Sequence, residues 1–539
     1  MYLKSFFLKI FFVPFTIILL IMLPDMLFAM ANKHYLFVTN FTEVKKLFLF
    51  VLFFTFLKYR YKVVALSFFY LFIYLSLASF NYFGQLSTPY DILLFFTHSG
   101  EVLAGLKNES WALGVPFLIS IFSFVLALFW IKKVDKYTLQ FPYSSLIFVV
   151  MLSVLPYRIY KDVYILNIDS VMKYPQTTST SLRNSYKAMN YFFLVTLPKS
   201  LAEHKHTILS DDKVAEIKTR SVQANIILIL GESFRSKSAS FINKNALKNM
   251  PKLSRFSQEK KIYAKNALAA GTMTKVSISY LLHQVDSIEH IPRLYGSKFS
   301  LFKQAKDNNL STHFITHQSA SDSRYLIPMI SAQHIDDIQT PVEILHTDNL
   351  GATVDDGNII KSLNLVNLTK PNFIVLQMQG SHTPYSTKSP KAFKTFESEY
   401  ENSIEYTDSV LGGLISYLES KKKSILPTYI LFVSDHGEML GERGMYGHDH
   451  LEEEVFKVPF FYYSTEENNS MKNFIEDSML LTHFDISQML LSLMGYDISL
   501  QVQNHRHALI MGKDVDGYNG YLDVMIENKD INISKIKSR

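Results

Sequence analysis

Carboxylate and imidazole side chains that could bind a metal ion follow apolar segments at two places in the second half of the chain. Glu232 comes after the apolar run 225–230, and Asp435 and His436 come after the run 429–433. These side chains offer oxygen and nitrogen atoms, the ligand types that zinc takes in proteins. Taken singly, Glu232 could instead favour a helix N-terminus, and the Asp-His pair could close a turn. Their shared position after apolar runs, with a glycine beside each, favours a metal site.

A candidate nucleophile lies in the segment 271–277, Gly-Thr-Met-Thr-Lys-Val-Ser, where a glycine turn is followed by a helical pattern. A threonine hydroxyl bound to zinc has a lowered pKa and can act as an alkoxide. The N-terminus of the following helix would add backbone amides that stabilise a phosphoryl group. Thr272 and Thr274 both fit this role, although without further context either is more simply explained as an ordinary helix N-cap.

Two further histidines could serve a phosphoryl group at such a site. His382 follows a third apolar run, 372–378, and His448 lies shortly after the Asp-His pair. Imidazoles placed there could donate hydrogen bonds to phosphoryl oxygens or act as general acid and base. A solitary polar side chain in a loop is more often a surface residue, and His450 and Glu438 are open to that interpretation.

The elements that must position these residues belong to an α/β domain. The runs 225–230, 372–378 and 429–433 are continuously apolar, as expected of strands buried on both faces of a parallel sheet. The segment 400–419, between the last two runs, has apolar residues at helical spacing. Each strand ends in polar residues, and ligand sites of α/β sheets lie at the carboxyl ends of the strands. The sequence therefore predicts a mostly parallel sheet, flanked by helices, within 224–539.

The first part of the chain is dense in Phe, Leu and Ile. A membrane-spanning helix needs about 20 residues. Five segments are apolar enough to predict transmembrane helices: 6–28, 44–56, 63–80, 115–131 and 145–157. The first could instead be a cleaved signal peptide, but its apolar run is longer than that of a signal and further candidates follow. We expect a transmembrane domain over 1–160, a bridging segment over 161–223 and a catalytic domain over 224–539.

Loop charges predict the orientation of these helices. Basic residues are concentrated in the loops after the second and fourth segments: Lys58, Arg60, Lys62, Lys132, Lys133 and Lys136. Both loops are therefore expected in the cytoplasm, which places the N-terminus in the cytoplasm and the catalytic domain outside it.

Composition excludes some functions. The chain has no cysteine, which excludes thiolate catalysis and metal sites built from cysteine. Its net charge of +6 is spread thinly, without a basic run typical of nucleic-acid binding. We therefore expect a membrane protein without a nucleic-acid partner.

Four motifs occur in one order along the second half: Gly-Glu-Ser-Phe-Arg at 231–235, Gly-Thr-Met-Thr-Lys-Val-Ser at 271–277, Gly-Ser-His-Thr-Pro-Tyr at 380–385 and Ser-Asp-His-Gly-Glu at 434–438. In these motifs the chain resembles the phosphoethanolamine transferases. These are sulfatase-like enzymes of the alkaline phosphatase superfamily that modify lipid A, lipopolysaccharide core or periplasmic glucans. The segment 400–408 also looks like the family's Tyr-x-Asn-Ser-x-x-Tyr-x-Asp helix. The resemblance covers about 224–464 closely, and the five-span N-terminal region matches in plan.

The resemblance implies a catalytic zinc ion with four protein ligands: Glu232, Thr274, Asp435 and His436. It makes Thr274, rather than Thr272, the nucleophile, through the family pattern Gly-x-x-Thr-x-x-Ser. It also implies that His382 and His448 contact the transferred phosphate, and it suggests Arg324 as a further phosphate contact. His382 and His448 could hold a second zinc ion, which the sequence leaves open.

By the same resemblance, the enzyme would transfer phosphoethanolamine from phosphatidylethanolamine to a lipid or glycan acceptor in the envelope, such as lipid A. The transfer would pass through a covalent intermediate on Thr274. The expected location is the bacterial inner membrane, with several spans and a periplasmic catalytic domain. Two alternatives remain: a membrane phosphoglycerol transferase on the same scaffold, and a membrane scaffold protein without catalytic activity.

Overall fold

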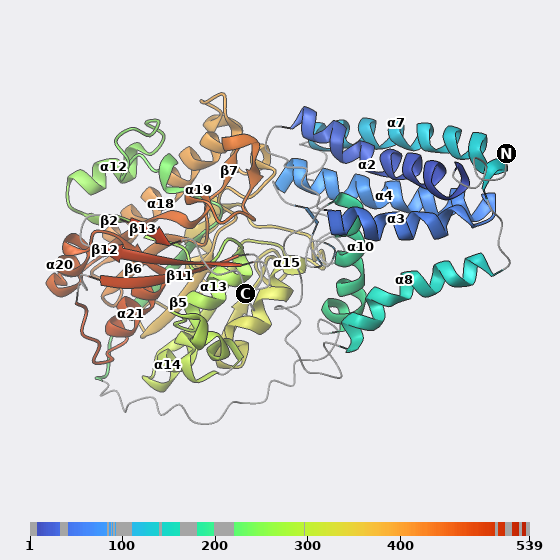
Figure 1. Cartoon of the computed structure of the whole chain (residues 1–539). Helices are drawn as coiled ribbons and strands as arrows, with labels where there is room; N and C mark the ends of the chain where they lie inside the picture. Colours follow the sequence, from blue (N-terminus) through green and yellow to red (C-terminus); the bar gives the residue numbers. More distant parts are fainter. Residues whose placement is uncertain are drawn as a thin grey trace. The chain divides into compact units, whose positions relative to one another are not determined.

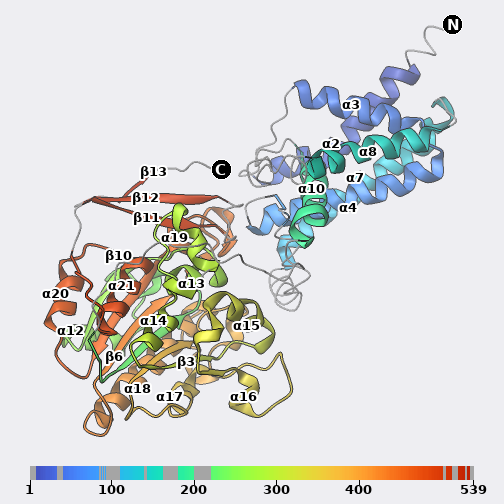
Figure 2. The same ribbon diagram turned by 90° about the horizontal axis from the view of Figure 1, so that it is seen from below.

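The structure, a computed structural model, describes residues 8–32, 41–83, 86–87, 89, 92, 110–138, 143–161, 180–198, 220–295, 297–501, 505–512, 520–527 and 531–534. The chain divides into two compact units: Met1–Lys205 with Leu440–Gly447, and His206–Met439 with His448–Arg539. The first unit is mainly helical, and the second is an α/β unit (Figures 1 and 2). The predicted bridging segment 161–223 contributes one described helix, α10, and most of its other residues lie outside the described ranges.

Apolar helices build the first unit. They are α2 (Val13–Ala31), α3 (Phe41–Thr55), α4 (Tyr59–Phe83), α7 (Ser110–Val134), α8 (Ser144–Tyr160) and α10 (Ser181–Tyr191), with π-helical turns at Leu8–Phe12 and Phe192–Thr196. Three stretches are long and apolar enough to cross a membrane: Ile10–Ala31, Tyr59–Asn81 and Leu113–Val134. The predicted helical membrane region is therefore confirmed.

The number of spans differs from the prediction. The predicted second and fifth spans are helices, but α3 has 15 residues and α8 has 17. At about 1.5 Å per residue such helices reach roughly 22–26 Å, less than the hydrocarbon core of about 30 Å. Their apolar runs were already the shortest of the five in the sequence. Among the described residues, the number of helices that reach spanning length is therefore corrected from five to three.

Buried polar contacts join the helices of the first unit. Asp25 in α2 accepts hydrogen bonds from the backbone nitrogen and the hydroxyl of Ser181, at 3.0 and 2.9 Å, and so holds the start of α10. Lys62 in α4 is buried and its ammonium group lies 2.7 Å from Asp135. A buried charge is unfavourable unless it is paired, so these contacts favour one arrangement of the helices.

The α/β unit contains an eight-stranded sheet in the order β10-β2-β9-β6-β1-β5-β3-β4. Its strands are β1 (Asn225–Gly231), β2 (Ile262–Leu268), β3 (Ser311–Thr316), β4 (Asp337–Gln339), β5 (Asn372–Gln377), β6 (Thr428–Ser434), β9 (Lys457–Ser464) and β10 (Leu481–Thr482). All neighbouring strands are parallel except β9, which runs antiparallel to β2 and β6. The prediction of a mostly parallel sheet is confirmed.

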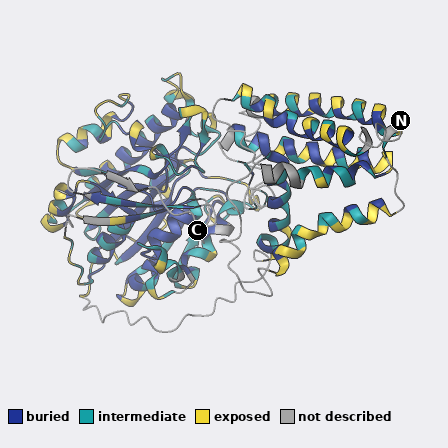
Figure 3. Ribbon diagram, viewed as in Figure 1, coloured by how far each residue is buried: buried dark blue, intermediate teal, exposed yellow. Residues whose placement is uncertain are grey.

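The three strands predicted from the sequence, β1, β5 and β6, lie side by side at the centre of this sheet. Every residue of β1 and β5 is buried, because helices cover both faces of the sheet (Figure 3). Figure 1 shows α12 and α18 on one side of the strands and α13, α14 and α21 on the other. Their bounds are Pro251–Gln258, Glu399–Lys421, Thr274–Leu282, Leu301–Asp307 and His483–Leu493, respectively.

Shorter helices complete the α/β unit: α15 (Ala320–Leu326), α16 (Pro341–Leu345), α17 (Ile359–Leu363), α19 (Glu453–Phe456) and α20 (Asn469–Asp477). A small antiparallel sheet follows, with β11 (His505–Met511), β12 (Tyr521–Glu527) and β13 (Ile531–Ser534). The backbone nitrogen of Met511 donates to the carbonyl of Ala270 at 2.9 Å, and that of Thr272 donates to the carbonyl of Met511 at 3.0 Å. These two bonds fix the turn that precedes α13.

Candidate active site

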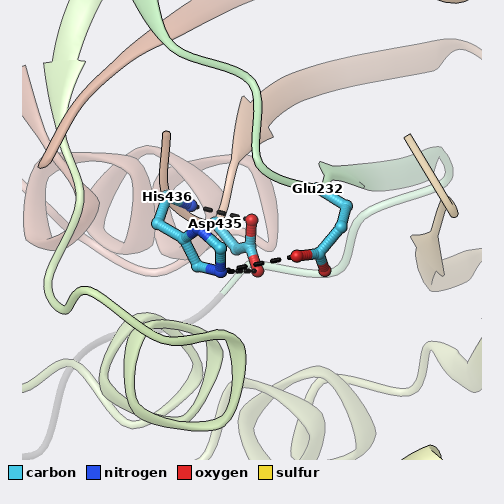
Figure 4. A group of neighbouring side chains, drawn as sticks. All are labelled: Glu232, Asp435 and His436. Carbon is cyan, nitrogen blue, oxygen red and sulfur yellow. Dashed lines mark hydrogen bonds and ion pairs between the residues drawn. The ribbon is translucent and has the colours of Figure 1, made fainter. Parts of the chain in front are cut away.

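The candidate metal ligands lie at the carboxyl ends of two neighbouring strands. Glu232 follows β1, whereas Asp435 and His436 follow β6. The two strands pair in parallel up to Gly231 opposite Ser434, so the residues that follow them meet at one edge of the sheet. In Figure 4 the three side chains point toward one another.

The three side chains form one buried group. Nε2 of His436 lies 3.4 Å from Oε1 of Glu232 and 3.3 Å from Oδ2 of Asp435. One ligand atom from each residue lies within 4.8 Å of the others. Within the described structure, Oδ2 of Asp435 is a buried oxygen without a hydrogen-bond partner. Two carboxylates buried side by side are unfavourable, and a divalent cation between them would offset that cost. The donor set therefore fits a metal ion.

The pKa values of the group follow from its burial. Burial raises the pKa of Glu232, and the adjacent Asp435 carboxylate acts in the same direction. Burial also raises the pKa of Asp435, to about 6. Burial lowers the pKa of His436, and neighbouring His448 adds to this effect. The imidazole is therefore neutral at pH 7, which is the form that binds a metal.

The orientation of His436 suits metal binding. Its Nδ1 lies 3.0 Å from the carbonyl oxygen of Gly437, which can only accept a hydrogen bond. Nδ1 therefore carries the proton, and the lone pair of Nε2 faces the two carboxylates. A Cβ atom at Gly437 would lie only 2.2 Å from the carbonyl oxygen of Glu454, so the turn requires glycine.

Metal affinity is expected to decrease as the pH is lowered, because protons and the cation compete for the same carboxylate oxygens. The pKa of Asp435 is raised to about 6, so this carboxyl group becomes protonated below that pH. The affinity should therefore be nearly constant above pH 7 and fall by about tenfold per pH unit below pH 6. Competition with a chromophoric chelator between pH 5 and 8 measures this; an affinity independent of pH would contradict it.

Thr274 is the first residue of α13 and lies at the ligand group. Its Oγ1 is 3.2 Å from both Oε1 and Oε2 of Glu232 and 3.2 Å from Nε2 of His436. A hydroxyl at this position could share a bound cation with these side chains and become a nucleophile. The start of α13 also directs backbone N–H groups toward an anion.

Thr272 lies in a different environment from Thr274. Its side chain is fully buried, and its hydroxyl makes no hydrogen bond within the described residues. The sequence pattern left both threonines as candidate nucleophiles, and the structure brings only Thr274 to Glu232 and His436.

His448 stacks on His436, with ring centroids 4.3 Å apart and an interplanar angle of 26°. Its Nδ1 lies 3.5 Å from Oε2 of Glu438, which is 3% exposed. Burial lowers the pKa of His448, but the paired Glu438 carboxylate, together with the charges of Asp449 and Glu232, outweighs this and raises the pKa to about 10. His448 is therefore cationic at pH 7. Glu438, which the sequence left open to a surface role, is instead a buried partner of this histidine.

His382 lies in the loop after β5, with Nδ1 2.7 Å from the carbonyl oxygen of Thr383. This loop approaches Glu232 closely: a Cβ atom at Gly380 would lie 2.8 Å from the backbone nitrogen and oxygen of Glu232. Burial lowers the pKa of His382, against an opposing effect of the Glu232 charge. The backbone of Arg324 lies in α15, and its side chain is outside the described part of the structure.

Two contacts of the ligand loop, residues 232–235 after β1, are not evident from the sequence. Nε2 of Gln318, just after β3, donates to Oε2 of Glu232 at 2.6 Å. The hydroxyl of Tyr400 in α18 donates to the carbonyl of Ser233 at 2.7 Å and accepts from the nitrogen of Arg235 at 3.1 Å. No strand was predicted at 311–316; such a prediction would have placed Gln318 at the same edge of the sheet as Glu232. The motif around Tyr400 does not indicate the contact of its hydroxyl with the ligand loop.

Replacing Tyr400 with phenylalanine is expected to lower the free energy of unfolding by about 2 kcal/mol, because two backbone groups of the ligand loop lose a buried partner. Ser233, one of these partners, has a φ of 54°, an unfavourable conformation for a residue with a side chain. Chemical denaturation of the full-length protein in detergent measures the change. The control is Tyr417→Phe, because the Tyr417 hydroxyl donates to Asn364 at an exposed position. Equal losses of unfolding free energy in the two variants would contradict the role of Tyr400 in stabilising the ligand loop.

The α/β unit matches the family model described as Sulfatase over residues 224–496, about half of the chain. The chain belongs to the sulfatase family.

The predicted resemblance to phosphoethanolamine transferases is confirmed by curated relatives of that name. Phosphoethanolamine transferase EptA of Helicobacter pylori is 24% identical in an alignment 274 positions long, which covers 45% of this chain and 48% of the relative. Phosphatidylethanolamine transferase Mcr-2 of Escherichia coli is 24% identical in an alignment 354 positions long, which covers 58% of this chain and 61% of the relative.

The chain thus spans about half the length of the curated relatives that it matches. A solved structure extends the similarity of fold over both units. It is the integral membrane protein lipooligosaccharide phosphoethanolamine transferase A (EptA) from Neisseria meningitidis, with a TM-score of 0.58 and 15% sequence identity. The similarity covers 90% of this chain and 96% of the other, so the two proteins share the combination of membrane helices and an α/β domain.

Proposed function

We propose that the protein is a zinc-dependent phosphoethanolamine transferase that uses Thr274 as its nucleophile. The observation that carries the proposal is the position of Oγ1 of Thr274, 3.2 Å from Glu232 and His436 in a buried group that fits a metal ion. The family and the names of the relatives supply the class of reaction. Residues 224–539 would form the catalytic domain, joined to the transmembrane domain 1–160 through 161–223.

Glu232, Thr274, Asp435 and His436 would hold one zinc ion. When bound, the ion would polarise the phosphoryl group and lower the pKa of the Thr274 hydroxyl. Thr274 Oγ1, which now donates to Glu232, would give up its proton to water when the site is occupied and would then attack phosphorus of phosphatidylethanolamine. The bond from phosphorus to the diacylglycerol oxygen would break, and that oxygen would take up a proton as diacylglycerol leaves.

The two histidines near the group would serve the phosphate in different ways. Cationic His448 could stabilise negative charge on the phosphoryl oxygens or give a proton to the departing oxygen. His382, whose pKa is lowered, is neutral. Because its Nδ1 donates to the carbonyl oxygen of Thr383, its Nε2 could accept the proton of the acceptor. In the second step an acceptor hydroxyl or phosphate would attack phosphorus, and the bond to Thr274 would break.

The acceptor and the location follow from the same proposal. The relatives include a Kdo(2)-lipid A phosphoethanolamine 7''-transferase of Escherichia coli, which favours an acceptor of the lipid A or lipopolysaccharide type. Membrane helices would keep the enzyme beside a lipid donor and a lipid acceptor. We place the protein in the bacterial inner membrane, with a cytoplasmic N-terminus and a periplasmic catalytic domain.

Mass spectrometry of the intact protein tests the proposal. The full-length protein in detergent is incubated with zinc and phosphatidylethanolamine, and with phosphatidylglycerol in a parallel sample. A mass increase of one phosphoethanolamine unit with release of diacylglycerol is expected only with the first lipid. An adduct only from phosphatidylglycerol would support the phosphoglycerol transferase instead. Neither an adduct nor diacylglycerol from a zinc-loaded protein would overturn the proposal in favour of a non-catalytic scaffold.

A further inference from the structure

We propose that Gln318 is a positioning residue for the metal site: its side-chain amide holds one oxygen of Glu232 and leaves the other for the cation. The inference rests on the metal site of the proposed function and on no choice of donor or acceptor lipid. Gln318 belongs to neither of the strands that supply the ligands; it follows β3, which is separated from β1 by β5.

The contacts of Gln318 define the orientation of its amide. Nε2 donates to Oε2 of Glu232 at 2.6 Å and to the carbonyl oxygen of Met378 at 3.3 Å. Both partners can only accept, and a carboxamide has two N–H donors on one side. The amide nitrogen, and not its oxygen, must therefore face Glu232.

The contacts of Glu232 show what this bond achieves. Oε2 receives the amide of Gln318, whereas Oε1 accepts from the hydroxyl of Ser233 at 3.2 Å and faces Nε2 of His436 at 3.4 Å. Both oxygens also lie 3.2 Å from Oγ1 of Thr274. Gln318 therefore fixes the rotation of the carboxylate, with Oε1 directed to the candidate ligands. A neutral amide does this without cancelling the negative charge that a cation needs, whereas lysine at this position would compete with the cation.

Loss of this bond is expected to weaken metal binding without unfolding the protein. Outer partners of metal ligands typically contribute about 10–100-fold to affinity, because they hold the ligand in the binding geometry. Gln318 is only partly buried, so a substitution of similar length leaves little empty space. The expected effect of Gln318→Met is a zinc affinity about 10–100-fold lower than that of the unchanged protein.

The experiment uses the full-length protein in detergent, stripped of metal and titrated with zinc against a chromophoric chelator. Gln379→Met is the matched control: Gln379 is also partly buried just after a strand, but its amide donates to the carbonyl of Val354 at 2.6 Å. We expect its zinc affinity to stay within about twofold of the unchanged protein, since it touches no ligand. Thermal unfolding of the metal-free proteins identifies any variant that does not fold, and Gln318→Ala replaces Gln318→Met in that case.

An unchanged zinc affinity in a folded Gln318 variant would overturn the inference, and so would equal losses in the Gln318 and Gln379 variants. The result is independent of the lipid chemistry. In one outcome, the Gln318 variant loses zinc affinity as expected while the unchanged protein releases no diacylglycerol. That outcome would support the role of Gln318 and overturn the proposed transferase function.

Discussion

Replacing Thr274 with alanine is expected to abolish the covalent intermediate and to lower turnover by at least about 1,000-fold. The hydroxyl of Thr274 lies 3.2 Å from Glu232 and His436, and alanine has no atom there that could bond to phosphorus. Any residual reaction would need water to attack in place of the side chain. The rate of diacylglycerol release and the intact mass after incubation with phosphatidylethanolamine measure both effects.

Thr272→Val is the matched control for this variant. Thr272 lies in the same turn, but its hydroxyl is buried and makes no hydrogen bond among the described residues, so a methyl group can replace it. Its turnover is expected to stay within about threefold of the unchanged protein. Thr274→Ser, which keeps a hydroxyl, should retain part of the activity and still form the adduct. An adduct on Thr274→Ala, or its loss in Thr272→Val, would contradict Thr274 as the nucleophile.

The sequence was sufficient to predict the centre of the α/β fold. Continuous apolar runs such as 225–230 arise because both faces of a central strand are covered, and β1 is indeed buried at every residue. The architecture of parallel sheets then places functional polar residues at the carboxyl ends of strands. Glu232, Asp435 and His436 could therefore be grouped from the sequence alone, although they come from distant parts of the chain.

Contacts between side chains far apart in sequence could not be predicted in this way. The bond from Gln318 to Glu232 depends on β3 and β5 standing beside β1, which no local pattern around Gln318 reveals. The choice between Thr272 and Thr274 depends on where the turn ends and α13 begins, and boundaries of elements are the weakest part of a sequence interpretation. The buried pairing of Glu438 with His448 likewise requires the folded loop.

The second large effect concerns metal binding. Asp435→Asn is expected to lower zinc affinity by at least about 100-fold, because the amide is a neutral and weaker ligand than the carboxylate. Metal analysis of the purified protein and chelator competition measure this. The backbone contacts of the loop should survive, since Oδ1 of Asp435 accepts from Ser233 at 3.2 Å and from His436 at 2.7 Å, and asparagine keeps that oxygen.

The same substitution is expected to stabilise the metal-free protein. Burial raises the pKa of Asp435 to about 6, which means that the ionised carboxylate is unfavourable in the folded state. Its cost is at most about 3 kcal/mol at pH 7, since each pKa unit corresponds to about 1.4 kcal/mol. Asparagine carries no charge and places an N–H donor beside the Glu232 carboxylate. We therefore expect the metal-free Asp435→Asn protein to unfold at a free energy about 1–3 kcal/mol higher than the metal-free unchanged protein.

The pH dependence of this difference identifies its cause. The folded protein binds a proton on Asp435 more tightly than the unfolded chain does, so the stability of the unchanged protein falls as pH rises from about 4 to about 6. The advantage of Asp435→Asn should be small near pH 4, grow through this window and stay constant above it. Adding zinc should reverse the order, because only the unchanged protein gains the binding free energy. If asparagine instead lowered stability at pH 7 without metal, the carboxylate would have a structural role, and the buried acidic group would no longer indicate a cation site.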